Sequence, residues 1–246
     1  MHIITQKTLR AAWEQHADAE NALRKWYTEM KNLTFQNFAD LRRRYPTADQ
    51  VGRLTVFNIK GNHYRLVVRI DYTYGKVFIR SFMTHAEYDK EDWKMIPGSD
   101  MSTMTGSYAN LLDYFEPRPI TNDEQYWETN AVVDQLLSQP ELSQDAQEYL
   151  HLLSLLLESY DEQQNTVPEL RGVELLRMLI AESALKQRDL LPIFKHESVI
   201  SDILAGRRKL TVKQIDQLAA FFELPHRLFF EPQAVASSRS AVAAVA

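Results

Sequence analysis

Hydrophobic positions recur at helical spacing near the start of the chain. Between residues 5 and 31 they follow one another mostly at three- and four-residue steps, and residues 36 to 45 repeat the pattern before Pro46. Such spacing puts apolar side chains on one face of an α-helix. We therefore predict two amphipathic helices, whose buried faces carry Leu9, Ala12, Trp13, Ala22, Leu23, Trp26, Tyr27, Met30, Phe38 and Leu41.

Three segments rich in β-branched and aromatic residues follow, at residues 54–59, 63–72 and 76–84. The short sequences KGN and TYGK separate them, which predicts a three-stranded antiparallel meander. If Gly61-Asn62 and Tyr74-Gly75 are two-residue loops, Asn58 lies opposite Arg65 and Arg69 lies opposite Arg80.

Alternation along these strands predicts two unlike faces, because successive side chains point to opposite sides of a sheet. The apolar face should pack against the helices, and it carries Phe57, Ile59, Tyr64, Leu66, Val68, Ile70, Val77, Ile79 and Met83. The cationic face carries Lys60, His63, Arg65, Arg69, Arg80 and Thr84 among Val67, Phe78 and Phe82.

The cationic face is a candidate phosphate-binding surface. Two arginines directly opposite each other repel unless a carboxylate or an anionic ligand lies between them, and Asp71 is the only acid predicted on this face. Arg65 and Arg69 would lie about 13 Å apart, close to two nucleotides of extended backbone, while an aromatic ring stacks on a base. An ordinary solvated sheet face is the alternative, and a one-residue slip in the second hairpin would break the arginine pair.

A short helix is predicted directly after the third strand. Thr84 and Glu87 form a capping box, which gives both a structural role. His85, Tyr88 and Asp89 then share one helix face. Cleavage of RNA without a metal needs groups that move protons at the 2′ and 5′ oxygens and cations that stabilise the charge on phosphorus. His85 and Tyr88 could transfer the protons, and the arginines could stabilise the charge.

Charge divides the chain into three blocks. Residues 1–97 carry 16 Lys+Arg and 11 Asp+Glu, residues 98–170 carry 1 and 14, and residues 171–246 carry 11 and 8. The formal charge of −5 is therefore an average over unlike parts. Apolar pairs at helical spacing predict that the acidic block is helical, with a break at Pro140, and these pairs are Val132, Val133, Leu136, Leu137, Leu152, Leu153, Leu156 and Leu157.

Residues 185 to 211 predict a helix-turn-helix. Ile200, Ile203 and Leu204 form the buried stripe of a short helix that Gly206 closes, and Thr211 with Gln214 forms a second capping box. Residues 198 to 204 would enter the major groove, and the basic triplet that follows would hold phosphates. A solvated helix end is the alternative for this triplet. The predicted DNA-contacting residues are His196, Ser198, Ser201, Asp202, Arg207, Arg208 and Lys209.

The first 96 residues resemble HigB-type toxins of the RelE superfamily, most specifically in VFNIKGNHYRL at residues 56–66 and THAEYD at residues 84–89. The resemblance implies a small α/β endoribonuclease that cuts mRNA, usually on the translating ribosome. It does not assign acid and base roles, and we expect Gly61 and Asn62 to serve the turn. The positions that match the family pattern are Asn58, Gly61, Asn62, Arg65, His85, Tyr88 and Asp89. The predicted catalytic residues are Arg65, Arg69, Arg80, His85, Tyr88 and Asp89, and the predicted RNA-binding residues are Asn58, Lys60, His63 and Phe82.

The C-terminal part resembles HigA-type antitoxins with an Xre-like domain, chiefly in SVISDILAGRRKLT. Lys195 departs from that family, since it occupies a turn position that is often glycine. Glu197 and Asp202 stand where the family often has basic residues, although a carboxylate can accept a hydrogen bond from cytosine N4. The resemblance implies that the acidic block docks on the toxin, and opposite charges would orient this docking. An acidic surface that only keeps the protein in solution is the alternative.

Met101, within PGSDMSTMTGS, lies where a separate antitoxin reading frame would begin. The sequence thus predicts a toxin and an antitoxin joined by a flexible connector. The expected fold class is α+β, with two N-terminal helices and a RelE-like antiparallel sheet, followed by an all-α domain with a helix-turn-helix. The expected parts are a toxin domain (1–96), a linker (97–107), an acidic docking region (108–170), a DNA-binding domain (171–232) and a disordered tail (233–246).

The predicted function is a self-neutralised toxin–antitoxin pair that represses its own promoter. Expected partners are mRNA on the ribosome, operator DNA and a second copy of the chain as a homodimer, with the toxin–antitoxin contact made within or between chains. The alternative is a transcription regulator with an inactive RelE-like domain. A ligand-sensing enzyme unrelated to RNA has no support, since a glycine-rich phosphate loop is lacking.

Composition adds several expected absences. Cysteine is absent, the seven histidines show no H-x-x-x-H spacing, and no run of about 18 apolar residues or signal-peptide pattern occurs. We therefore expect a cytoplasmic protein with no metal, no cofactor and no membrane partner.

Overall fold

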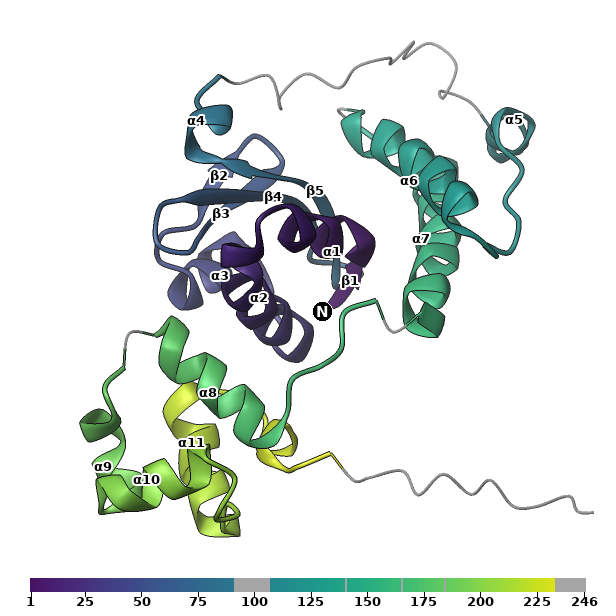
Figure 1. Cartoon of the computed structure of the whole chain (residues 1–246). Coiled ribbons are helices and arrows are strands. Elements are labelled where there is room, and N and C mark those ends of the chain that lie inside the picture. Colours follow the sequence, from purple (N-terminus) through teal and green to yellow (C-terminus); the bar gives the residue numbers. More distant parts are fainter. Residues whose placement is uncertain (91–106, 140, 165, 184, 233–246) are drawn as a thin grey trace, which may run out of the picture. The chain divides into compact units, whose positions relative to one another are not determined.

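The computed structural model describes residues 1–90, 107–139, 141–164, 166–183 and 185–232 (Figure 1). The chain divides into two compact units, Met1–Glu169 and Leu170–Ala246. The first unit contains a sheet and helices, and the described part of the second is helical, so the fold class is α+β as predicted. The predicted break at Pro140, the predicted tail and all of the predicted linker except Ser107 lie outside the described residues.

Within the described residues, five strands form one mixed sheet in the order β1-β5-β4-β3-β2. The predicted meander is confirmed as β3 (Leu54–Ile59), β4 (Tyr64–Asp71) and β5 (Lys76–Thr84). β2 (Asp49–Val51) adds to β3 antiparallel, and β1 (His2–Ile4) pairs with β5 in parallel, so the sheet is not purely antiparallel. The sequence did not predict these two strands because three residues are too few to show a period of two.

Helices α1 (Gln6–Gln15), α2 (Glu20–Asn32) and α3 (Phe38–Arg44) pack on one side of the sheet. The single helix predicted over residues 5–31 is wrong. The chain leaves helical geometry at His16 and makes a short 3₁₀ turn, η1 (Ala17–Ala19), before α2 begins. This break brings the apolar faces of both helices to one core, which contains Leu9, Trp13, Leu23, Trp26, Leu66, Val68 and Ile79.

The two hairpins of the meander differ. The first has the predicted register, with Asn58 opposite Arg65. The second turns through four residues, Tyr72–Gly75, because the Asp71 carboxylate accepts hydrogen bonds from the N–H groups of Thr73 and Tyr74 at 2.9 and 3.0 Å. As a result Arg69 lies opposite Phe78, and the predicted Arg69–Arg80 pair is wrong.

A β-bulge in β5 changes which side chains share a face. Val68 lies opposite Ile79 and Val67 lies opposite Ser81, so Arg80 is the extra residue of the bulge. Beyond it the faces exchange relative to the prediction. Phe82 contacts the helix-side core, and Met83 joins a small cluster on the other side. The predicted positions of Phe82 on the cationic face and of Met83 on the apolar face are therefore wrong.

Helices α5 (Tyr108–Tyr114), α6 (Asp123–Ser138) and α7 (Gln144–Gln164) form what we call the arm. Their apolar side chains make one cluster that also contains Ile4 and Phe78 from the sheet. Both sheet residues point away from the core of α1–α3, so the arm covers the opposite face (Figure 1). The predicted helical character of the acidic block is confirmed for the described residues.

Helix α4 (His85–Tyr88) follows β5 and begins with the predicted capping box of Thr84 and Glu87, which is confirmed. This box fixes the direction in which the chain leaves the sheet. The backbone N–H of His85 also donates to the His63 carbonyl at 3.0 Å. α4 is therefore tied to the first hairpin.

In the second unit, α8 (Gly172–Glu182) precedes η3 (Gln187–Leu190), α9 (Leu191–Phe194), α10 (Glu197–Leu204), α11 (Val212–Phe222) and η4 (His226–Phe229). The capping box of Thr211 and Gln214 is confirmed, and Gly206 closes α10 with a φ of 74°. Phe194, Ile200, Leu218 and Phe229 are buried. None of the helices within the described ranges combines the length and apolar character that crossing a lipid bilayer requires.

Candidate functional site

Arg65 is the centre of a cluster at one end of the cationic face. Its side chain donates to Asn62 Oδ1 at 2.8 Å and to the backbone carbonyls of Asn62 and Tyr64 at 3.3 and 3.2 Å. The guanidinium also lies 5.6 Å from the centre of the Tyr88 ring. Arg65 is only 8% exposed, so its guanidinium is held in one place. Asn62 therefore does more than form the turn, and the N-x-x-R spacing was the sequence signal for this second role.

His85 and Asp89 lie within hydrogen-bonding distance of each other beside this arginine. His85 Nδ1 lies 2.9 Å from Asp89 Oδ2, and the two side chains are 41% and 59% exposed. When Nδ1 carries the proton it donates to the carboxylate, which leaves Nε2 with a lone pair. That arrangement suits a group that accepts a proton from a substrate. The structure thus brings together Arg65, His85, Tyr88 and Asp89, with the His63 backbone adjoining.

Three predicted RNA-binding residues lie outside this cluster. Lys60 Nζ pairs with Asp18 at 2.6 Å. Asn58 donates to the Thr47 carbonyl at 3.4 Å, and Phe82 stacks on Tyr64 on the helix side, with ring centres 5.0 Å apart. The fourth, His63, is exposed on the first hairpin, where its Nδ1 lies 2.7 Å from the Lys60 carbonyl.

Asp18 was not predicted as part of any site. Hydrogen bonds from Lys60 and Tyr64 lower the pKa of its carboxyl group. The local sequence could not show this link, because Asp18 precedes Lys60 by 42 residues.

Arg69 and Arg80 lie beneath the arm. Arg80 Nη1 donates to the Asp134 carboxylate at 2.6 Å and to the Asp134 carbonyl at 3.0 Å. Arg69 Nη1 donates to the Leu137 carbonyl at 2.5 Å. Burial lowers the pKa of both arginines and raises that of Asp134 to about 6, while Arg80 acts on Asp134 in the opposite direction. The arm therefore binds two of the predicted catalytic cations and leaves Arg65 to its own cluster.

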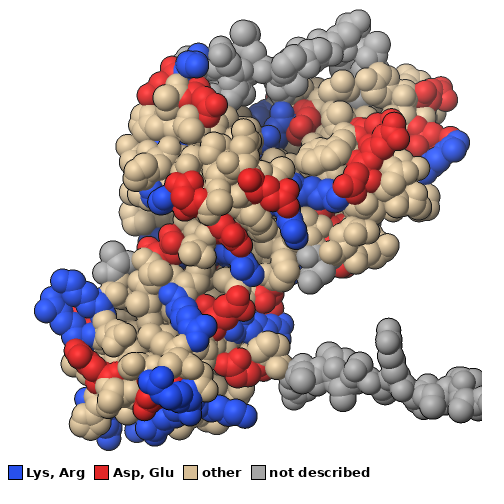
Figure 2. All heavy atoms as spheres, viewed as in Figure 1, with Lys and Arg blue, Asp and Glu red and all other residues tan. Residues whose placement is uncertain are grey.

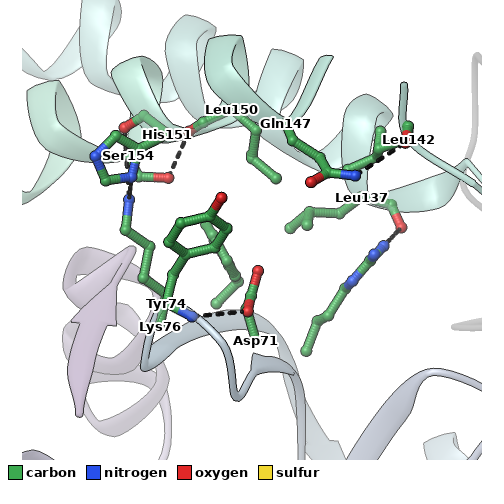
Figure 3. A pocket seen from close by; sticks show the side chains of 11 residues that line it. Asp71, Tyr74, Lys76, Leu137, Leu142, Gln147, Leu150, His151 and Ser154 are labelled. Atoms are coloured by element: carbon green, nitrogen blue, oxygen red, sulfur yellow. Dashed lines mark hydrogen bonds between the residues drawn. The ribbon is translucent and has the colours of Figure 1, made fainter. Parts of the chain in front are cut away.

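Lys76 is a third cation under the arm, and the sequence did not single it out. Its ammonium group lies 2.8 Å from His151 Nδ1 on α7 (Figure 3). Burial and the charge of Lys76 lower the pKa of His151, which fits a neutral imidazole whose Nδ1 accepts a hydrogen bond from the ammonium group. This contact satisfies a buried lysine without a carboxylate.

A cavity of about 40 Å³ remains between the arm and this part of the sheet (Figure 3). Its walls include Arg69, Lys76 and Phe78 from the sheet and Leu137, Gln147 and His151 from the arm. One water needs roughly 10–15 Å³ by this measure, so the cavity has room for a few waters but not for a nucleotide. The arm therefore packs closely against this face of the sheet.

In the second unit, the segment predicted to be a helix-turn-helix contains the short helices α9 and α10, which are joined at Lys195. Ser198, Ser201 and His196 are exposed, as are Arg208 and Lys209. Basic side chains gather on this unit on the face shown in Figure 2.

Asp202 binds a neighbouring arginine within this motif. Its carboxylate accepts from Arg207 Nε at 2.9 Å and lies 2.8 Å from a terminal nitrogen of the same guanidinium. The sequence had suggested readout of a base by Asp202. In the structure this carboxylate also positions Arg207, five residues later.

Comparison with known proteins identifies a toxin family in the N-terminal part of the chain. A family model described as HigB_toxin, RelE-like toxic component of a toxin-antitoxin system, matches residues 19–91. The mRNA interferase toxin HigB of Escherichia coli (strain K12) is 34% identical over 92 residues, which are 36% of this chain and 88% of the relative.

Two further relatives match the chain over 93 and 120 residues. The mRNA interferase HigB of Escherichia coli O6:H1 is 26% identical over 93 residues, or 37% of this chain and 90% of the relative. Antitoxin HigA of Escherichia coli (strain K12) is 28% identical over 120 residues, which are 46% of this chain and 83% of the relative. The chain therefore belongs to the HigB toxin family and joins that toxin to a HigA-like antitoxin in one polypeptide.

Proposed function

We propose that the toxin part of this fusion is a metal-independent endoribonuclease that cuts mRNA on the ribosome in the cytoplasm. The observation that carries the proposal is the cluster in which Arg65 is fixed between Asn62 and Tyr88 beside the His85–Asp89 pair. Relatives that are named mRNA interferases support the choice of substrate.

The cluster has the groups that cleavage by the 2′ oxygen needs. His85 takes the proton of the 2′-OH while Asp89 stabilises the imidazolium that forms. The 2′ oxygen bonds to phosphorus, the bond from phosphorus to the 5′ oxygen breaks, and Tyr88 gives its hydroxyl proton to the departing oxygen. Arg65 stabilises the charge on the phosphoryl oxygens. The products are a 2′,3′-cyclic phosphate and a 5′-OH.

The arm holds this toxin inactive within the same chain. It covers Arg69, Lys76, Arg80 and Phe78, which make up the part of the face that RNA would otherwise contact. His85 stays partly exposed, so inhibition acts on RNA binding and not on the proton-transfer groups. Joining the two parts in one polypeptide keeps their effective concentration high.

Expression of residues 1–96 alone tests the nuclease. We expect growth arrest and loss of intact mRNA, and no such effect from the full chain. Arg65→Ala and His85→Ala should abolish toxicity. Arg43→Ala is the matched control, because this α3 arginine is 85% exposed and lies outside the cluster. If the unmutated fragment leaves growth and mRNA unchanged, the chain is instead a transcription regulator with an inactive RelE-like domain.

For the second unit, we propose binding to operator DNA as a homodimer and repression of its own promoter. Exposed Ser198 and Ser201 on α10, followed by an exposed basic triplet, support this role. Arg207→Ala should weaken binding equally for all sequences and lower the salt slope by about 1, whereas Ser201→Ala should change sequence preference. Binding that ignores salt and both substitutions would contradict the assignment.

A further inference from the structure

The C-terminal end of α6, residues 134–138, presents several oxygen acceptors to the sheet, and we call it the last turn of α6. Arg69 bonds to the Leu137 carbonyl, and Arg80 bonds to both the carbonyl and the carboxylate of Asp134. The last four carbonyls of a helix lack helical partners and lie at the negative end of its dipole. Leu137 is one of these positions. Two guanidinium groups thus meet a carboxylate and partly negative oxygens, which is the chemistry they would meet on a phosphodiester.

Asp71 acts on Arg69 through its charge, but among the described residues no sheet carboxylate forms a hydrogen bond or ion pair with Arg69 or Arg80. Asp71 was the acid expected to separate the arginines, but its carboxylate caps its own loop through the N–H groups of Thr73 and Tyr74. The acceptors described for Arg69 and Arg80 come instead from α6. An anion from outside the sheet therefore takes the place between these cations.

The arm and a nucleic acid strand cannot share this place. Phe78 is 2% exposed and packs into the core of the arm, so it offers no face to a base. The 40 Å³ cavity beside it is too small for a nucleotide. Binding of RNA at Arg69 and Arg80 requires the last turn of α6 to leave.

The electrostatic contacts made by the arm are modest for the cations it covers. Among the described side chains, Asp134 is the carboxylate bonded to this group of cations, while Lys76 bonds to an imidazole and Arg69 to a carbonyl. An RNA strand offers one full charge per nucleotide. RNA therefore has the stronger electrostatic attraction to these cations. Binding of the arm is favoured instead by its covalent tether and by the burial of Phe78.

We propose that the last turn of α6 occupies the place of an RNA phosphate, so that RNA competes with the arm for Arg69 and Arg80 and opens the fusion. The proposal rests on RNA binding by the toxin face, as proposed above, and names RNA itself as the ligand that relieves inhibition.

A binding experiment on the full chain tests this competition. The probe is a fluorescent 2′-O-methyl RNA of about ten nucleotides, which has no 2′-OH nucleophile and still carries the phosphates. All variants carry Arg207→Ala and Arg208→Ala, so that the basic loop of the second unit contributes little. Fluorescence anisotropy should show Asp134→Ala binding the probe about tenfold tighter than the parent, because the arm has lost its charged contact.

Matched variants make the result specific. Glu128→Ala removes an exposed carboxylate from the same helix and should leave affinity unchanged. Adding Arg80→Ala to Asp134→Ala should remove the gain. Asp134→Asn, which keeps the size of the side chain, should show a smaller gain and guards against unfolding of the arm. A gain that survives Arg80→Ala, or equals that of Glu128→Ala, overturns the proposal.

Hydrogen exchange supplies the second readout. A saturating amount of the probe should speed amide exchange at residues 130–138 in the parent chain, because that turn must leave the sheet. Unchanged exchange at saturation means that RNA binds elsewhere and overturns the competition. Neither measurement depends on RNA cleavage. The competition can therefore be confirmed in a chain that has no nuclease activity, and it can be refuted even if the toxin fragment is an active nuclease.

Discussion

Lys195 holds a backbone conformation that favours glycine. It joins α9 to α10 with a φ of 67° and a ψ of −37°, and its side chain is exposed. A residue with a Cβ is strained in this region. We expect Lys195→Gly to raise the free energy of unfolding of the second unit by about 1 kcal/mol, measured by urea denaturation. Lys195→Ala retains the Cβ and should bring no such gain, so equal stabilisation by both would assign the effect to the lost charge.

Tyr88 combines two roles that substitution can separate. Its ring lies under the Arg65 guanidinium, and its hydroxyl is the proposed proton donor. Tyr88→Phe should lower kcat of residues 1–96 on a short RNA about a hundredfold with little change in KM. Tyr88→Ala should cost more and should also raise KM, because Arg65 loses its support. Full activity of Tyr88→Phe would remove the hydroxyl from the mechanism.

At the scale of elements, the capping box at the start of α4 connects fold to chemistry. Thr84→Ala breaks the hydrogen bonds that fix this short helix, which carries His85 and Tyr88. A lost N-cap costs about 1 kcal/mol. We expect several-fold slower RNA cleavage by residues 1–96. Thr211→Ala in the full chain removes the equivalent box of α11 and should destabilise the second unit by a similar amount.

Measuring cleavage and thermal stability together shows whether Thr84→Ala acts on the catalytic cluster or only on folding stability. If Thr84→Ala leaves cleavage unchanged while it lowers thermal stability, α4 is held well enough by its other contacts. One such contact is the hydrogen bond from the His85 N–H to the His63 carbonyl.

Local chemistry allowed some elements to be predicted and not others. The first hairpin and both capping boxes depend on side chains a few residues apart, and all three are confirmed. The second hairpin had a similar signal in Asp71, whose carboxylate starts a four-residue turn, but the prediction used Tyr74-Gly75 alone. The bulge at Arg80 has no local signal, because an extra residue becomes visible only when two strands are aligned.

At the scale of the whole toxin–arm unit, net charge predicted that the arm docks on the sheet, but the sequence did not predict which residues make the contacts. The acidic block and the basic sheet predicted docking, and the arm does cover the sheet. Arg80 meets Asp134 across 54 residues, and Lys76 meets His151 across 75. Such pairs depend on how the helices fold back, which spacing within either segment cannot show.

Asp161 gives this unit a pH dependence with a definite sign. Its side chain is 1% exposed, and burial raises its pKa to about 6 from 3.8. The folded state therefore binds the proton more tightly, so the contribution to stability is full below 3.8 and is lost as pH rises through about 6. Asp161→Asn should be more stable than the parent at neutral pH by on the order of 2–3 kcal/mol, and this difference should shrink toward about pH 4.

Urea unfolding of the parent and of Asp161→Asn across this pH range measures the difference in their free energies of unfolding. Groups that titrate equally in both proteins do not contribute to this difference. Asp123→Asn is the control of opposite sign. Hydrogen bonds from Lys7 and Tyr160 lower the pKa of Asp123, so its contribution is present at neutral pH and is lost in acid. A pH-independent difference between Asp161→Asn and the parent would contradict the assignment.

The same carboxylate also completes a helix that belongs to the toxin. Thr5 makes no side-chain cap for α1, and the N–H of Gln6 donates instead to Asp161 Oδ2 of the arm at 3.0 Å. A toxin whose arm has left must expose this N–H together with Ile4 and Phe78. The toxin part without the arm should therefore be less stable than the full chain. If the arm inhibits the nuclease as proposed, this lower stability would limit how long the nuclease acts after the arm leaves.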